Sequence, residues 1–183
     1  AAWHQGMRAK LGLTEEQAAM AVPDITGTLA RYMVEARSRA LPPQVAKEGK
    51  HRILDSLAAI VSGAHMKPGE MAIKFARSQG GTAEASVLTT DIRTTAINAA
   101  LVNGMFGHAD ETDDFEPTTK AHPGCSVVPA ALAMAEREGR SGTELLNGVA
   151  LGYDLCCRLL LALGPDLVRG SHRSAEGTSS TFG

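Results

Sequence analysis

Residues 103–126 read N-G-M-F-G-H-A-D-E-T-D-D-F-E-P-T-T-K-A-H-P-G-C-S, a polar stretch between two apolar segments that have helical spacing. Four carboxylates fall within five residues of this stretch, with one histidine before them and one after; these are Asp110, Glu111, Asp113, Asp114, His108 and His122. No amphipathic helix or strand needs this pattern, and like charges this close repel one another. The pattern predicts a functional loop held between rigid helices, and a solvated acidic loop is the plainer alternative.

The segments on either side of this loop predict a mostly helical fold. Apolar spacing favours a helix from Asp24, with a buried stripe at Ile25, Leu29, Tyr32, Met33 and Ala36. Pro42-Pro43 predicts the start of a second helix, which stops near Gly63 and turns Val45, Ile53, Leu54, Leu57, Ala58 and Val61 towards a core. Shorter helices are expected over 68–77 and 94–106, and a strand or extended segment over 84–90.

Helix signals continue after the loop. Ser126 is expected to cap a helix that has Pro129 in its first turn, and Ser141-Gly-Thr-Glu144 has the form of a capping box for a last helix that Gly164-Pro165 ends. The fold class is therefore all-α. We expect a poorly organised segment at 1–23 and a helical domain at 24–183.

Composition narrows the function classes. The 183 residues have 44% hydrophobic and 21% charged residues, an ordinary globular balance. A net charge of -2 offers no basic face for phosphates, so no nucleic-acid partner is expected. No apolar run approaches about 20 residues, which predicts no membrane span. No secretory leader is recognised, and three cysteines, two of them adjacent, do not suggest a disulfide framework, so we expect a cytoplasmic protein.

The loop supplies groups for proton transfer. Its two histidines exchange protons near neutral pH, and crowded carboxylates raise one another's pKa, so one of them can act as a general acid or base. Lys120 adds positive charge that suits an anionic substrate. A calcium-binding EF-hand is excluded because Phe115 and Ala121 stand where the glycine and the final glutamate belong. A zinc site from His108, Asp110 and His122 stays open as an alternative, and with it a metal-dependent hydratase.

Three motifs in order along the chain resemble the MmgE/PrpD family: N-G-x-x-x-H-A-D-E-T-D-D, H-P-G-C-S-V-V-P-A-A-L-A-M-A-E and S-G-T-E-L-L-N-G-V-A-L-G-Y-D-L-C-C-R-L. The family includes 2-methylcitrate dehydratase, cis-aconitate decarboxylase and iminodisuccinate epimerase, and the resemblance covers about residues 24–183. It implies a large all-helical domain, a smaller α+β domain later in the chain, and a homodimer. It also implies proton transfer next to a carboxylate of a small di- or tricarboxylic acid, with no metal or organic cofactor.

The resemblance also assigns roles to residues. It implies that His122, Glu111 and Asp113 are catalytic, and that Asp114, Lys120, His172 and His108 help to bind substrate. His122 stands in the family's H-P-S motif, and Glu111 takes the first acidic position of H-x-L-D-F-D-D-T. The chain departs from these motifs where Phe115 replaces a Thr and Gly124 replaces a Ser.

The expected function is that of a lyase or isomerase, most simply a hydro-lyase, with decarboxylation and epimerisation as alternatives. Family members are much longer, so the resemblance implies a site that is incomplete without a C-terminal portion. A second polypeptide that carries this portion is one explanation, and a fragment of a longer chain is the other. An inactive helical module for carboxylate binding or assembly is the alternative function, because of the changes at Phe115 and Gly124.

Overall fold

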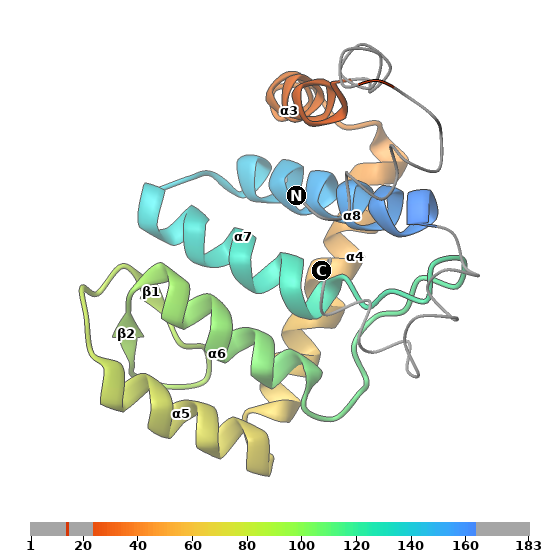
Figure 1. Ribbon diagram of the computed structural model, residues 1–183. Coiled ribbons are helices and arrows are strands. Elements are labelled where there is room, and N and C mark those ends of the chain that lie inside the picture. Colours follow the sequence, from red (N-terminus) through yellow and green to blue (C-terminus); the bar gives the residue numbers. More distant parts are fainter. Residues whose placement is uncertain (1–13, 15–23, 164–183) are drawn as a thin grey trace. The chain divides into compact units, whose positions relative to one another are not determined.

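The computed structural model describes Thr14 and residues 24–163, which divide into two compact units after Arg39 (Figure 1). This part of the chain holds six helices and one two-stranded hairpin, so the mostly helical fold predicted from the sequence is confirmed. The loop of interest, its flanking helices and the hairpin all belong to the second unit.

Helix α3 (Ile25–Ala36) is the described helix of the first unit. Its start agrees with the sequence, since the Asp24 side chain accepts a 2.8 Å hydrogen bond from the amide of Gly27. The predicted stripe is not buried within the described residues, because Ile25 is 60% exposed and Met33 is 40% exposed. Three members of the stripe are half-buried: Leu29, Tyr32 and Ala36.

Helix α4 (Pro43–Gly63) begins and ends where the sequence predicts, and its predicted buried face is only partly right. Leu57 packs against the main core cluster and Ile53 is half-buried, but the other four expected core residues are exposed: Val45, Leu54, Ala58 and Val61. The buried face is made mainly of small residues instead: Gly49, Ser56, Ala59, Ile60 and Gly63. Small side chains allow neighbouring helices to come close, and a Cβ on Gly63 would collide with the carbonyl oxygen of Phe106.

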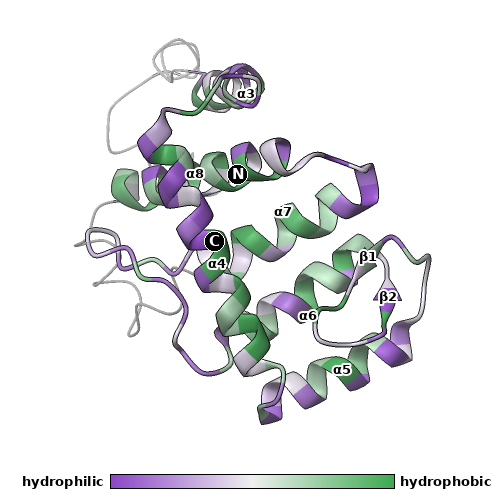
Figure 2. Ribbon diagram, turned by 180° about the vertical axis from the view of Figure 1, so that it is seen from behind, coloured by the Kyte–Doolittle hydropathy of each residue, from purple (hydrophilic) through white to green (hydrophobic). Residues whose placement is uncertain are grey.

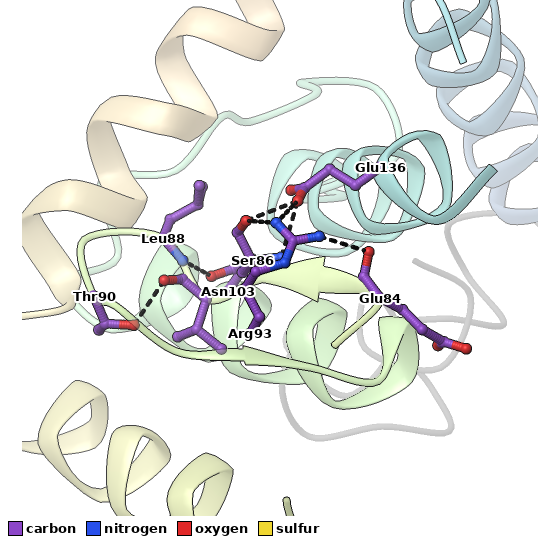
Figure 3. A network of polar contacts seen from close by, with 8 residues as sticks. Glu84, Ser86, Leu88, Thr90, Arg93, Asn103 and Glu136 are labelled. Atoms are coloured by element: carbon purple, nitrogen blue, oxygen red, sulfur yellow. Dashed lines mark hydrogen bonds and ion pairs between the residues drawn. The ribbon is translucent and has the colours of Figure 1, made fainter. Parts of the chain in front are cut away.

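A short hairpin follows helix α5 (Lys67–Gln79) and packs on the helices after it. Strands β1 (Ala85–Ser86) and β2 (Arg93–Thr94) pair antiparallel. Figure 3 shows Glu136 accepting hydrogen bonds from the Ser86 amide and hydroxyl, at 3.0 and 2.7 Å, and from Arg93 at 3.2 Å. Buried Asn103 accepts from the Leu88 amide at 2.9 Å and donates to the Ser86 carbonyl at 3.0 Å, which fixes the hairpin to helix α6.

Helices α6 (Ala96–His108), α7 (Gly124–Glu138) and α8 (Gly142–Leu163) complete the second unit. Helix α6 contacts α4, α5 and α7, and its Val102 and Phe106 are fully buried in the main core cluster with Ile60. Helix α7 starts at Gly124, two residues before the predicted cap at Ser126. The capping box of α8 is confirmed, since the Ser141 amide donates to Glu144 at 2.9 Å and the Glu144 amide donates to the Ser141 hydroxyl at 3.3 Å.

One stretch of the described chain, Gly142–Ala162 in α8, is long and apolar enough to cross a membrane by length and composition only. Core helices of soluble proteins pass the same test. Helix α8 buries Val149, Cys156 and Leu160, and it contacts α7 and α4.

Candidate functional site

The acidic loop runs from the end of α6 to the start of α7 and lies in the second unit (Figure 1). Its colouring in Figure 2 is largely hydrophilic, whereas α6 is mainly hydrophobic. The loop is tied to α4 near its start, because Asp110 accepts hydrogen bonds from the hydroxyls of Ser62 and Thr112. These two bonds lower the pKa of Asp110. Asp110 therefore anchors the loop, and its carboxylate is engaged away from the histidines.

A tight turn built on Glu116 precedes His122. The Glu116 carboxylate accepts hydrogen bonds from the amide and hydroxyl of Thr119, both at 2.6 Å, and from the amide of Thr118 at 3.1 Å. Its backbone amide donates to the carbonyl of Ala121 at 2.9 Å. Partial burial works to raise the pKa of Glu116, but the hydrogen bonds from Thr119 and Thr118 outweigh it and lower this pKa to about 2. The turn fixes the backbone that carries His122.

The structure brings three of the predicted site residues together around one carboxylate. Nδ1 of His108 lies 3.5 Å from Oδ2 of Asp113, and Nδ1 of His122 lies 3.7 Å from Oδ1. The Asp113 side chain is only 1% exposed, and its oxygens accept no hydrogen bond from the part of the chain that the structure describes. Because a buried charge costs free energy unless its neighbours compensate it, the two imidazoles are the groups placed to do so. His122 is 27% exposed and can still meet a ligand.

Asp114 points away from this cluster although it is the next residue. Its Oδ1 accepts a 2.8 Å hydrogen bond from the amide of Gly124, in the first turn of α7, and Arg52 of α4 lies 4.0 Å from its Oδ2. Burial raises the pKa of Asp114, and the Asp113 charge adds to this rise, while Tyr153, Gly124 and Arg52 work against it. For Asp114, burial therefore shifts the pKa more than the neighbouring charge does. Asp114 holds helix α7 in place, so the expected substrate contact stays a prediction.

Phe115 lies beside His122, and Lys120 lies over the Phe115 ring. The Phe115 ring centroid is 5.5 Å from that of His122, and Lys120 Nζ lies 5.1 Å from the Phe115 ring. Phe115 is 45% exposed, and Lys120 is also exposed. This places a cation and an apolar surface next to the histidine. Lys120 also has a positive φ of 63°, which the Glu116 turn imposes.

Glu111 does not join the cluster. It is exposed and has a positive φ of 55°, an unusual backbone conformation for a residue with a side chain. His172 lies outside the described residues, so its role stays a prediction.

Cys125 lies in the first turn of α7, next to His108 and Asp113 of the cluster. Its thiol donates to the carbonyl oxygen of His122 at 3.2 Å. Burial raises the pKa of this thiol to about 12, and the nearby Asp113 carboxylate contributes to the rise. A thiol of this kind stays protonated at neutral pH, which argues against a nucleophilic role.

Sequence reasoning missed two polar residues near Asp114, namely Ser56 of α4 and Tyr153 of α8. Their hydroxyls lie around the same space beside Gly124 as the Asp114 carboxylate. Both hydroxyl oxygens are buried and have no hydrogen-bond partner among the described residues. In the sequence, only the presence of a serine between the apolar positions of α4 could have indicated a polar contact there. Tyr153 fits the apolar spacing of α8, which is typical of an ordinary core residue.

A pocket of about 180 Å³ lies between α4 and α8; Val45, Glu48, Gly49, Arg52, Val149, Ala150 and Tyr153 line it. None of His108, Asp113 and His122 belongs to that lining. We place the candidate site at the histidines, because they supply groups that exchange protons near neutral pH.

Comparison with known proteins identifies the class. The model of the MmgE/PrpD N-terminal domain matches residues 27–183. The chain therefore belongs to the MmgE/PrpD family.

Two fungal relatives are similar over most of the chain. This chain is 28% identical over 158 residues to the cis-aconitate decarboxylase-like protein oryM of Aspergillus oryzae. The alignment covers 81% of this chain and 33% of that protein. This chain is 24% identical over 150 residues to a cis-aconitate decarboxylase of Aspergillus terreus. The alignment covers 79% of this chain and 31% of that protein. The chain thus spans about a third of the length of these relatives.

Proposed function

We propose that this chain carries the proton-transfer residues of a lyase or isomerase that acts on a small di- or tricarboxylic acid. Decarboxylation of a substrate like cis-aconitate is the form that its relatives favour, and dehydration or epimerisation are the alternatives. The observation that supports this proposal most is the position of His122, a partly exposed imidazole whose Nδ1 lies 3.7 Å from the buried Asp113 carboxylate.

The contact with Asp113 gives the two nitrogens of the His122 ring different roles. A carboxylate beside Nδ1 favours the tautomer that is protonated there, and Nε2 is then left to exchange a proton with substrate. In dehydration or epimerisation, neutral His122 takes the proton next to a substrate carboxylate. In decarboxylation, departure of CO₂ leaves the bonding electron pair on the remaining carbon chain, and protonated His122 delivers a proton to it. Asp113 stabilises the imidazolium in either direction.

Substrate binding falls to the hydrogen-bond donors near His122. Lys120 and His108 are exposed, so both can donate hydrogen bonds to substrate carboxylates. Phe115 beside His122 offers an apolar contact for the carbon chain. Glu111 and His172 complete the predicted set of site residues, and neither needs a metal or an organic cofactor in this proposal.

Activity is proposed for the complete protein, because the chain spans about a third of its relatives' length. In this proposal the remaining portion supplies further pocket walls, on the same polypeptide or on a second one, and the assembled enzyme is a homodimer.

The test is turnover by the complete protein of cis-aconitate, 2-methylcitrate and iminodisuccinate. CO₂ release, water loss and exchange of solvent deuterium into the substrate, followed by NMR, distinguish the three reactions. We expect His122→Gln to lower kcat/KM by about 10²- to 10⁴-fold, the usual contribution of a general acid or base. The control is His65→Gln, an exposed histidine after α4, which should change kcat/KM less than about twofold.

Two outcomes would count against this proposal. Equal activity of His122→Gln and wild type would remove His122 from the chemistry. Saturable binding of these acids without turnover of any of them would favour the inactive carboxylate-binding module.

A further inference from the structure

Three different metal-binding side chains converge beside His122. Nδ1 or Nε2 of His108, a carboxylate oxygen of Asp113 and Sγ of Cys125 all lie within 4.8 Å of one another. They come from three parts of the chain, namely the last residue of α6, the loop, and the first turn of α7. A local sequence motif could not reveal such a set, because 17 positions separate its first and last members.

The central carboxylate is the second, independent indication of a ligand. Asp113 is 1% exposed, and both its oxygens lack a hydrogen bond within the described part of the chain. They point towards the imidazoles at 3.5 and 3.7 Å, which is longer than a good hydrogen bond. Buried carboxylates are normally hydrogen-bonded, paired or bound to a metal. A cation between these side chains would satisfy Asp113 more fully than the imidazoles do.

The donor types select the kind of metal. Nitrogen, oxygen and thiolate sulfur together suit Zn²⁺ or Co²⁺, whereas Mg²⁺ and Ca²⁺ prefer sites made of oxygen alone. The Cys125 thiol is protonated in the metal-free protein, so it releases its proton to solvent when the metal ion binds. Ligand bonds of about 2.0–2.3 Å place the donors of a tetrahedral site roughly 3.3–3.8 Å apart. The 3.5 Å separation of His108 and Asp113 already lies in that range, and Cys125, whose sulfur lies within 4.8 Å of both donors, would have to move closer by up to about 1 Å.

We propose that His108, Asp113 and Cys125 form a binding site for a thiophilic divalent metal ion such as Zn²⁺. Three protein ligands leave a fourth position open, and His122 is a further donor beside the site, with its Nδ1 3.7 Å from Asp113. Asp110, which the sequence suggested as a zinc ligand, is held by Ser62 and Thr112 and takes no part.

This site goes beyond the proposed function and opposes it. A metal ion on Asp113 withdraws the carboxylate that orients His122, so the metal inhibits proton transfer. Binding is a property of these side chains alone and can be measured without any substrate. A failure of this proposal is therefore distinguishable from a failure of the proposed activity.

The test is a titration of Co²⁺ into the complete protein, untagged, reduced and stripped of metal by a chelator. Co²⁺ replaces Zn²⁺ at such sites and gives a cobalt–thiolate charge-transfer absorption in the near ultraviolet. The decisive comparison is Cys125→Ser against Cys157→Ser, since Cys157 is a half-buried cysteine of α8 outside the cluster. Asp113→Asn removes the charge of a second ligand. Circular dichroism confirms that each variant is folded.

We expect one thiolate band per protein chain that saturates with Co²⁺ and is displaced by Zn²⁺. Cys125→Ser should abolish the band, Asp113→Asn should weaken Co²⁺ binding at least about tenfold, and Cys157→Ser should leave both unchanged. The proposal is overturned by the absence of a thiolate band in the wild type. It is equally overturned by a band that survives Cys125→Ser or that disappears in Cys157→Ser.

Discussion

The backbone amide of Gly124 donates a 2.8 Å hydrogen bond to Oδ1 of Asp114, and this contact joins the acidic loop to the first turn of α7. Pro123 precedes that turn and supplies no side-chain cap, so the Asp114 carboxylate takes over this role. A negative charge is also favoured there by the helix dipole. Since His122 lies directly before this junction, the contact helps to fix its position.

A side chain at Gly124 should therefore be costly. A Cβ there would meet the Ser56 hydroxyl at 2.5 Å and the Tyr153 hydroxyl at 2.9 Å, and it would collide with Asp114 Oδ1. We expect Gly124→Ala to lower the free energy of unfolding by about 1–3 kcal/mol, as overpacking of a buried site does. Urea denaturation of the purified chain measures this change.

Gly148→Ala in α8 is the matched control for that substitution. Nothing lies within 4 Å of a Cβ at Gly148, and alanine is the better helix former by about 0.5–1 kcal/mol. This variant should be more stable than wild type. A stable Gly124→Ala protein would show that the three groups around Gly124 can rearrange freely.

The helix ends of this fold could be predicted from sequence because local signals set them. Pro42-Pro43 and the capping box at Ser141 act within one turn of their helices, and both predicted starts are confirmed. The start of α7 was misplaced because its cap comes from Asp114, ten residues earlier in the chain. No local rule connects those two positions.

The buried face of α4 could not be predicted for a different reason. Hydrophobic periodicity favoured Val45, Leu54 and Val61, yet the helix packs with Ser56, Ala59 and Gly63 inwards. Close approach to α6 requires small side chains, as the contact between Gly63 and Phe106 indicates. Small residues carry a weak hydropathy signal, so only the packing of other helices reveals this face.

The candidate site, too, could be predicted only in part from the sequence. Residue types pointed to the histidines and carboxylates, and the structure does gather His108, Asp113 and His122. The sequence assigned catalysis to Asp113 and substrate binding to Asp114, but it gave no sign that Asp114 accepts a hydrogen bond from the start of α7. Nor did it single out Glu116, whose role depends on a turn that four hydrogen bonds close.

The Glu116 turn makes stability depend on acidity. Hydrogen bonds hold the pKa of Glu116 at about 2, below its ordinary value of 4.5, so ionisation favours the folded chain. This contribution is fully present above about pH 4.5 and is lost as the pH falls towards 2. After allowance for solvent screening, we expect Glu116→Gln to cost about 1 kcal/mol at pH 7. The cost should shrink between pH 4.5 and 2, as measured by urea denaturation at several pH values.

Glu138→Gln serves as the control for this pH series, because Glu138 lies at the exposed end of α7 next to Arg137. It should change the unfolding free energy by less than about 0.5 kcal/mol at every pH. A pH-independent cost of Glu116→Gln would mean that lost packing, rather than ionisation, causes the destabilisation.

Replacing each of the two neighbouring aspartates should separate chemistry from stability. Asp113 is a buried carboxylate without a hydrogen bond in the described structure, so Asp113→Asn removes a costly charge and should keep or raise stability by up to about 1 kcal/mol. The same change should lower kcat/KM of the complete enzyme about 10²-fold or more, because His122 loses its orienting partner. Asp114→Asn should instead lower stability by about 1 kcal/mol, since the cap of α7 and the contact with Arg52 are weakened. Measuring kcat/KM and urea denaturation on both variants tests whether Asp113 acts in catalysis and Asp114 in stability. A destabilised but fully active Asp113→Asn enzyme would reverse the roles assigned to these two carboxylates.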